Sequence, residues 1–224
     1  MNNSENDNSN TFEKENNNDS SEKEEIPIPL STLVDNQVII SGPEATTTYE
    51  NGFYGTLENE KLVLEAEEAI LLLERKRIHV SSSEGVQLSP SDLVAHFSTQ
   101  KPNFWAQYLV YKDLRNRGYV VRLGFGESAP YRLYHRGGKP GTDVSKTIVY
   151  PLPEGQDLEL SKLDEITAGA RRARKRLILA VVDRIGDVTF YSADQLKLER
   201  NQFTPVFLSE NQTTLNEQND LIIP

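Results

Sequence analysis

The segment from Phe104 to Tyr134 constrains the fold more than any other part of the chain, because it specifies three elements in a fixed order. Apolar residues recur at helical spacing at its start, and Gly118 follows them where a helix end favours glycine. Residues 119–123 and 131–134 then form two predicted strands joined by a glycine-rich turn. A helix that leads directly into a β-hairpin indicates a compact α/β domain.

The rest of this half alternates strands with one helix. Residues 147–152 and 188–191 are predicted strands, and residues 161–176 a helix with a basic C-terminal half. Residues 177–183, LILAVVD, are almost entirely apolar, which indicates a strand buried on both faces. We therefore expect a C-terminal α/β domain over residues 101–198.

A smaller α/β domain is predicted over residues 29–100. Residues 38–40 favour a short strand, and residues 51–55 form a turn bracketed by glycines. Residues 64–77 carry apolar side chains at helical spacing and basic residues in the last turn, where the helix dipole favours them. Ser89 then offers a helix N-cap. The predicted fold class is α/β (α+β), with two domains in sequence.

The formal net charge of −10 is concentrated at the two ends of the chain. Residues 1–28 form an acidic tail with a net charge of −6, and residues 199–224 a polar tail with a net charge of −3. Both are predicted to be disordered because they cannot bury enough apolar surface. The part between them is close to neutral, so the overall acidity does not exclude a nucleic-acid partner.

Several classes of protein are disfavoured by what the sequence lacks. The chain contains no cysteine, so it holds neither disulfides nor thiolate metal sites. It shows no apolar run of membrane-spanning length, no phosphate-binding glycine loop and no recognisable metal-site spacing of carboxylates. We expect a soluble, cytoplasmic protein that needs neither a metal nor another cofactor.

Together these segments resemble the archaeal tRNA-splicing endonuclease (tRNA-intron endonuclease) family over about residues 35–193. The strongest matches are VYKDLRNRGYVV and RKRLILAVVDRIGDVTFY in the second half. In the first half, the turn at residues 52–55 and the following LVLEAEEAILLLERKRIHV also fit. The resemblance implies a nuclease-like (restriction-endonuclease-like) fold for the C-terminal domain.

The resemblance also implies metal-independent cleavage of pre-tRNA at intron boundaries, which leaves a 2′,3′-cyclic phosphate and a 5′-hydroxyl. The family uses a tyrosine as the base, a histidine as the acid and a lysine to stabilise the charge on phosphorus. Tyr134 falls on the tyrosine position and Lys175 on the lysine position. Judged by residue type alone, Tyr134 could equally be a core aromatic and Lys175 a solvated helix-end charge.

The chain departs from the family at the histidine position, which falls on Val144 or, with a shift of one residue, on Asp143. Valine cannot donate a proton, and an aspartate could do so only with a pKa well above its usual value of about 3.9. His135 is adjacent to Tyr134, and neighbouring strand side chains point to opposite faces unless a bulge redirects one of them.

The C-terminal half carries basic clusters and acidic loops, which give two further sets of candidate residues. Arginines of the C-terminal half are predicted to contact RNA phosphates: Arg115, Arg117, Arg171, Arg172 and Arg174. Structural chains of the family insert an acidic loop into a partner, and two loops here are candidates for that contact: Glu154, Asp157 and Glu159 in one, Asp183 and Asp187 in the other. Surface ion pairs and solvated turns are the alternative roles for both sets.

The missing histidine favours a structural subunit, paired with a catalytic chain in an α2β2 assembly, over a catalytic chain. The first alternative is a catalytic subunit that uses Tyr134 and Lys175 with a substitute acid, acting in partnership with itself. The second is a nuclease-fold module that binds RNA or protein outside splicing. The expected partners are pre-tRNA and a second endonuclease subunit, with no role for a membrane.

Overall fold

The computed structural model describes residues 28–124, 126 and 130–194. Apart from Ile28, the two predicted tails, residues 1–28 and 199–224, lie outside the described residues. Within the described part, no helix is both long and apolar enough to cross a membrane. The mixture of helices and two separate sheets confirms the predicted α+β class.

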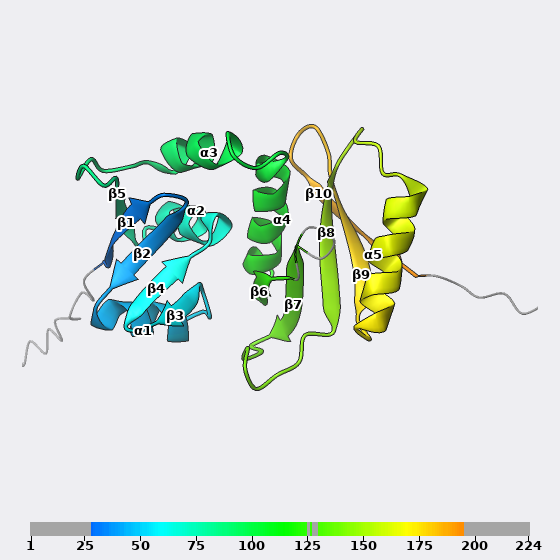
Figure 1. The fold of residues 1–224 in the computed structure, drawn as a ribbon, viewed down its shortest axis with the longest axis horizontal. Coiled ribbons are helices and arrows are strands. Elements are labelled where there is room, and N and C mark those ends of the chain that lie inside the picture. The colour runs from blue at the N-terminus through cyan, green and yellow to red at the C-terminus, as the bar shows by residue number, and fades with distance from the viewer. Residues whose placement is uncertain (1–27, 125, 127–129, 195–224) are drawn as a thin grey trace, which may run out of the picture.

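The first half contains a five-stranded sheet in the order β3-β4-β2-β1-β5 (Figure 1). Strands β1 and β5 are parallel, and the other neighbours are antiparallel. The strands are β1 (Leu30–Val34), β2 (Gln37–Ser41), β3 (Thr56–Glu58), β4 (Lys61–Leu64) and β5 (His79–Ser81). The helices of this half are α1 (Pro43–Glu50), α2 (Ala66–Glu74) and α3 (Pro90–Ser98).

Helices α1 and α2 differ from the expectation based on sequence. Helix α1 is additional: its three threonines are β-branched and poor helix formers, but Pro43 in the first turn has a backbone suited to a helix start. Helix α2 is shorter than the predicted span of residues 64–77. Leu64 completes strand β4, and Lys76 takes a left-handed conformation with φ 54°, which ends the helix.

The second half contains a five-stranded sheet in the order β10-β9-β8-β7-β6. Only β8 and β9 are parallel, and α5 makes the crossover between them. The strands are β6 (Tyr119–Leu123), β7 (Tyr131–Arg136), β8 (Thr147–Pro153), β9 (Arg176–Val182) and β10 (Val188–Ala193). Helices α4 (Phe104–Asn116) and α5 (Leu160–Arg172) lie on opposite sides of this sheet, with α4 toward the first half (Figure 1).

The two halves share one apolar core and several polar contacts. Buried residues from α2, α4 and both sheets form a single hydrophobic cluster. Arg115 donates to the carbonyl of Gly52 (2.8 Å) and lies 4.0 Å from the ring centroid of Tyr54. Arg122 donates to the carbonyls of Phe53 (3.0 Å) and Gly55. The turn at residues 52–55 is therefore held by two arginines of the second sheet and its helix.

Candidate functional site

One end of the second sheet aligns the residues expected to be catalytic. Leu133 pairs with Thr147, and Thr147 pairs with Arg176. Because β7 runs antiparallel and β9 parallel to β8, the next row of this register contains Tyr134, Lys146 and Lys175. The fold thus places the tyrosine and lysine positions in one row at the same end of the sheet, on strands that flank β8.

Lys175 is positioned by the way α5 ends. Arg174 adopts a left-handed conformation with φ 55°, and the Lys175 N–H donates to the carbonyl of Ala170 (2.9 Å), which is a Schellman-type stop. Strand β9 begins with the next residue, Arg176. The ammonium of Lys175 is therefore fixed at the junction of helix and strand.

The ammonium of Lys175 is engaged by Ser145. Nζ donates to the Ser145 hydroxyl (2.7 Å) and to the Ser145 carbonyl oxygen. Burial lowers the pKa of Lys175, and the positive charge of Arg132 lowers it further. Arg132 belongs to β7, the strand that also carries Tyr134. Neither Ser145 nor Arg132 was singled out as a site residue from sequence, and only the alternation along β7 (Arg132 and Tyr134 on one face) could have indicated Arg132.

Tyr134 is largely buried, with 7% of its surface exposed. A groove of about 830 Å³ surrounds Lys175 and is lined by Val144, Ser145, Arg171 and Arg174, among other residues. Tyr134 is not among the described residues that line this groove. The phenol and the ammonium thus share one end of the sheet but do not open into one groove.

Of the two residues that could occupy the predicted histidine position, only Val144 lines the groove. Val144 is 76% exposed, so its apolar side chain faces solvent at the rim of the groove. Asp143 points elsewhere: its carboxylate accepts from the Lys139 N–H (2.7 Å) and lies 3.4 Å from Nε2 of His135. His135 is the extra residue of a β-bulge, since Tyr134 pairs with Val120 and Arg136 with Tyr119.

The predicted RNA-binding arginines fall into different environments. Arg115 is buried and serves the contact between the two halves, so we leave it out of the RNA surface proposed below. Arg117 is exposed, and it donates to Asp113 (2.6 Å). Arg171, Arg172 and Arg174 are exposed around the end of α5, and the first and last of them line the groove beside Lys175.

The two predicted subunit-contact loops differ in their hydrogen bonding and in the residues that they expose. Glu154, Asp157 and Glu159 are exposed between β8 and α5. The carboxylate of Asp183 accepts from the N–H groups of Ile185 (3.0 Å) and Asp187 (2.8 Å), which shapes the β9–β10 turn. This turn presents Ile185 to solvent with 85% of its surface exposed.

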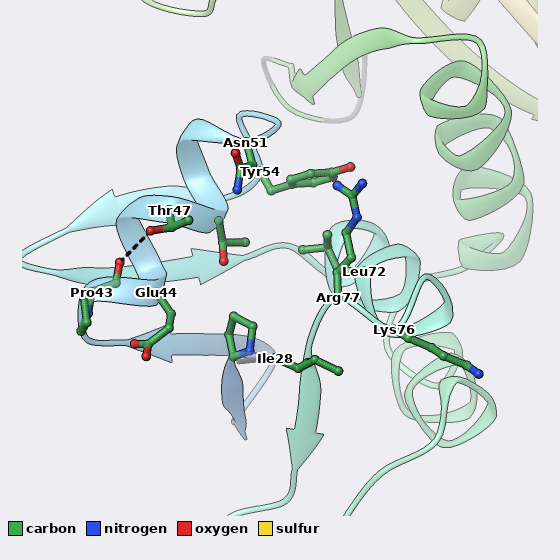
Figure 2. A pocket seen from close by; sticks show the side chains of 11 residues that line it. Ile28, Pro43, Glu44, Thr47, Asn51, Tyr54, Leu72, Lys76 and Arg77 are labelled. Atoms are coloured by element: carbon green, nitrogen blue, oxygen red, sulfur yellow. Dashed lines mark hydrogen bonds between the residues drawn. The ribbon is translucent and has the colours of Figure 1, made fainter. Parts of the chain in front are cut away.

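A separate cavity of about 500 Å³ lies in the first domain, beside α1 and the end of α2 (Figure 2). Its lining includes Glu44, Tyr54, Lys76 and Arg77. Among the described residues, none of the buried side-chain polar atoms without a partner belongs to this lining. We assign it no chemistry.

Comparisons with known proteins cover most of the described chain. Residues 30–94 match a family described as tRNA intron endonuclease, N-terminal domain, and residues 104–190 match tRNA intron endonuclease, catalytic C-terminal domain. A tRNA-splicing endonuclease of Pyrococcus furiosus is 39% identical over 150 residues, which is 66% of this chain and 84% of that protein. One from Methanothermobacter thermautotrophicus is 32% identical over 144 residues, 64% of this chain and 83% of that protein.

Other relatives are longer. A tRNA-splicing endonuclease of Methanococcoides burtonii is 34% identical over 175 residues, which is 78% of this chain but 49% of that protein. The chain therefore spans about half the length of this relative.

Proposed function

The chain belongs to the tRNA intron endonuclease family, and from that premise we propose that it is the structural subunit of a tRNA-splicing endonuclease. The assembly cleaves pre-tRNA at intron boundaries without a metal and leaves a 2′,3′-cyclic phosphate and a 5′-hydroxyl. A second chain supplies the complete set of tyrosine, histidine and lysine.

The observation that carries this proposal is the exposed valine at the histidine position. Departure of the 5′-oxygen needs a proton donor within hydrogen-bonding reach of that atom. Val144 offers none, although its exposed position would accommodate a polar side chain. The other two predicted positions keep the family's residue types, Tyr134 and Lys175, so the acid is the one residue type that is missing.

The contact between Lys175 and Ser145 supports the same proposal. A catalytic lysine must direct its ammonium at the phosphate oxygens, where charge develops. Here the ammonium instead donates twice to Ser145 and so ties the start of β9 to the loop before β8. We propose that Lys175 has a structural role in this chain.

In this proposal the exposed charged residues bind the pre-tRNA and the catalytic subunit. Arg171, Arg172 and Arg174 contact phosphates of the pre-tRNA, which positions the RNA without reading its sequence. The β9–β10 turn, with Asp183, Ile185 and Asp187, is our choice for the loop that contacts the catalytic subunit, because it combines acidic groups with an exposed apolar tip.

The test is cleavage of an intron-containing pre-tRNA in EDTA, by the purified chain alone and together with the catalytic chain of the same source. We expect no cleavage by this chain alone and cleavage with cyclic phosphate ends by the two together. Cleavage by this chain alone at the rate of the pair would overturn the structural role.

A second candidate is the catalytic subunit itself, and one observation favours it. The bulge at His135 and its 3.4 Å approach to Asp143 provide an imidazole held by a carboxylate, one residue from Tyr134. If this chain alone cleaves, the His135→Ala variant should lose that activity, and the Asp143→Asn variant should reduce it.

A further inference from the structure

The sharpest anomaly in the described residues is a buried carboxylate at the junction of the two domains. Glu67, in the first turn of α2, is 1% exposed. Its Oε1 lies 3.0 Å from the Tyr131 hydroxyl and 3.8 Å from Nζ of Lys101. Its Oε2 is buried and has no hydrogen-bond partner. An unpaired oxygen on a buried carboxylate is costly, so such a group usually has a partner in the functional state.

Even the contact with Tyr131 is shared. The Tyr131 hydroxyl also lies 3.1 Å from the carbonyl oxygen of Gln107, and a single hydroxyl proton cannot serve both acceptors fully. Lys101 is a weak partner, because its side chain is 45% exposed and its distance is close to the limit for an ion pair. The carboxylate of Glu67 therefore retains capacity for a strong donor.

This carboxylate lines a cavity of about 500 Å³. Lys101 and Gln107 also line the cavity, together with the largely apolar side chains of Leu123, Tyr150 and Pro151. A single acid beside an apolar wall suits a cationic group on an aliphatic stem, since the stem packs against the wall while the head pairs with the acid. Metal binding needs more ligands, and no cluster of three or more metal-ligating side chains occurs among the described residues.

The surroundings favour a protein partner over RNA. Gln156 accepts from Asn103 at the rim of the cavity (3.0 Å), which places the acidic segment of Glu154, Asp157 and Glu159 beside it. Phosphates would be repelled there, whereas a basic side chain would be attracted. A neighbouring groove shares Ala106 and Pro153 with the cavity and contains Trp105, which is 50% exposed, and Ile185. An exposed tryptophan and isoleucine next to a cavity that holds a buried carboxylate are typical of a protein-contact surface.

We propose that this interdomain cavity binds a lysine or arginine side chain of a partner protein, with the cationic head paired to Glu67. The inference rests on the proposed function only for the identity of that partner, the second endonuclease subunit. The binding chemistry itself belongs to this chain and can be tested without RNA and without the partner.

The test is an NMR titration of the ¹⁵N-labelled full chain with N-acetyl-arginine amide, compared with N-acetyl-citrulline amide, which has nearly the same shape but no charge. We expect saturable shifts of the amide signals of Gln107 and Leu123 with the arginine probe, and binding at least tenfold weaker with the citrulline probe. The Glu67→Gln variant should lose the arginine response. The Glu58→Gln variant, which changes an exposed acid in the first sheet, should retain it.

The Lys101→Ala variant should change the affinity for the arginine probe in the opposite direction from Glu67→Gln. It removes the competing ammonium at the exposed rim, so the arginine probe should bind more tightly than to the unaltered chain. This variant keeps the test decisive if Glu67→Gln does not fold. Three outcomes would overturn the proposal. The first is equal shifts with both probes, and the second is an arginine response that persists in a folded Glu67→Gln variant. The third is shifts of the same amide signals with polyuridylate and not with the arginine probe. A failure of the pre-tRNA cleavage test leaves this titration unaffected, so the two proposals fail separately.

Discussion

At the scale of single residues, the proposed structural role depends most on Val144. Because Val144 is 76% exposed, a histidine at this position should fit without disturbing the core. A positioned general acid contributes about 10²–10⁴-fold to such reactions. We expect the Val144→His variant to gain measurable cleavage of pre-tRNA in EDTA, at least tenfold above the unaltered chain.

The control for Val144→His is the double variant Val144→His/Tyr134→Phe, which should lose the gained activity because it lacks the base. No gain from Val144→His would mean that Lys175, while held by Ser145, or the buried Tyr134 also prevents catalysis. A high initial activity of the unaltered chain would contradict the structural role itself.

The Lys175→Ala variant should affect stability rather than cleavage. The ammonium makes two hydrogen bonds to Ser145, and hydrogen bonds from charged groups contribute about 1.5–3 kcal/mol each before solvent screening. Lys175 is only partly buried, so we expect a loss of about 1–2 kcal/mol in urea unfolding. Lys146 is a neighbouring, exposed lysine, and its Lys146→Ala variant should lose less than half as much free energy of unfolding. A large loss of cleavage by the complete complex with Lys175→Ala would show that this lysine is catalytic.

The residue types at the candidate site could be read from the sequence, but their burial and hydrogen-bond partners could not. The motifs aligned Tyr134 and Lys175 with two family positions, and the structure brings both to one sheet end. The absence of histidine at Val144 is a matter of residue identity alone. The bond from Lys175 to Ser145 and the bulge at His135 depend on loop geometry. No local pattern encodes that geometry, because Lys175 and Ser145 lie 30 positions apart and the bulge depends on the pairing of β7 with β6.

At the scale of elements, helix α4 supports two arginines with opposite roles. Arg115 is buried, donates to Gly52 and stacks on Tyr54, whereas the exposed Arg117 pairs with Asp113 one turn earlier. We expect Arg115→Ala to lower the free energy of unfolding by about 2–4 kcal/mol, from lost packing and a lost charged hydrogen bond. Arg117→Ala should cost about 0.5 kcal/mol or less. Urea denaturation of both variants measures the difference, and similar losses would contradict this assignment.

The sequence placed both arginines in one basic cluster because helical spacing shows which face a residue occupies, but not what covers that face. Gly52 and Tyr54 lie in the other domain, more than 50 positions away along the chain. Helix α4 itself was predictable from its apolar spacing, and so was the buried strand β9. Helix α1 and the short strands β3 and β4 were not, since few residues define them and tertiary contacts override their weak propensities.

At the scale of the whole molecule, the two predicted halves share one core. The sequence indicated where the composition changes, yet the acids of α2 gave no sign that they would be buried against the second half. Glu67, for example, accepts from the Tyr131 hydroxyl of the second sheet (3.0 Å). The next residue, Glu68, is 4% exposed, and its Oε2 accepts from the N–H groups of Gly55 (2.8 Å) and Glu65 (3.0 Å). A capping box is visible in a sequence, but the burial of that cap is not.

Burial of Glu68 gives the final prediction, a decrease of stability with rising pH. Desolvation raises the pKa of Glu68 from 4.5 to about 7, although the two N–H groups and Arg122 oppose the shift. The folded state therefore binds more protons than the unfolded state between these values, and the free energy of unfolding must fall as pH rises through this window. The loss should approach about 3 kcal/mol and level off above the folded pKa. Urea unfolding at pH 5 and pH 8 measures this loss.

The control is the Glu68→Gln variant. Its amide oxygen can still accept both hydrogen bonds, so the fold should persist while most of the pH dependence of the free energy of unfolding disappears. An unchanged slope in that variant would show that another group, and not Glu68, makes the stability depend on pH.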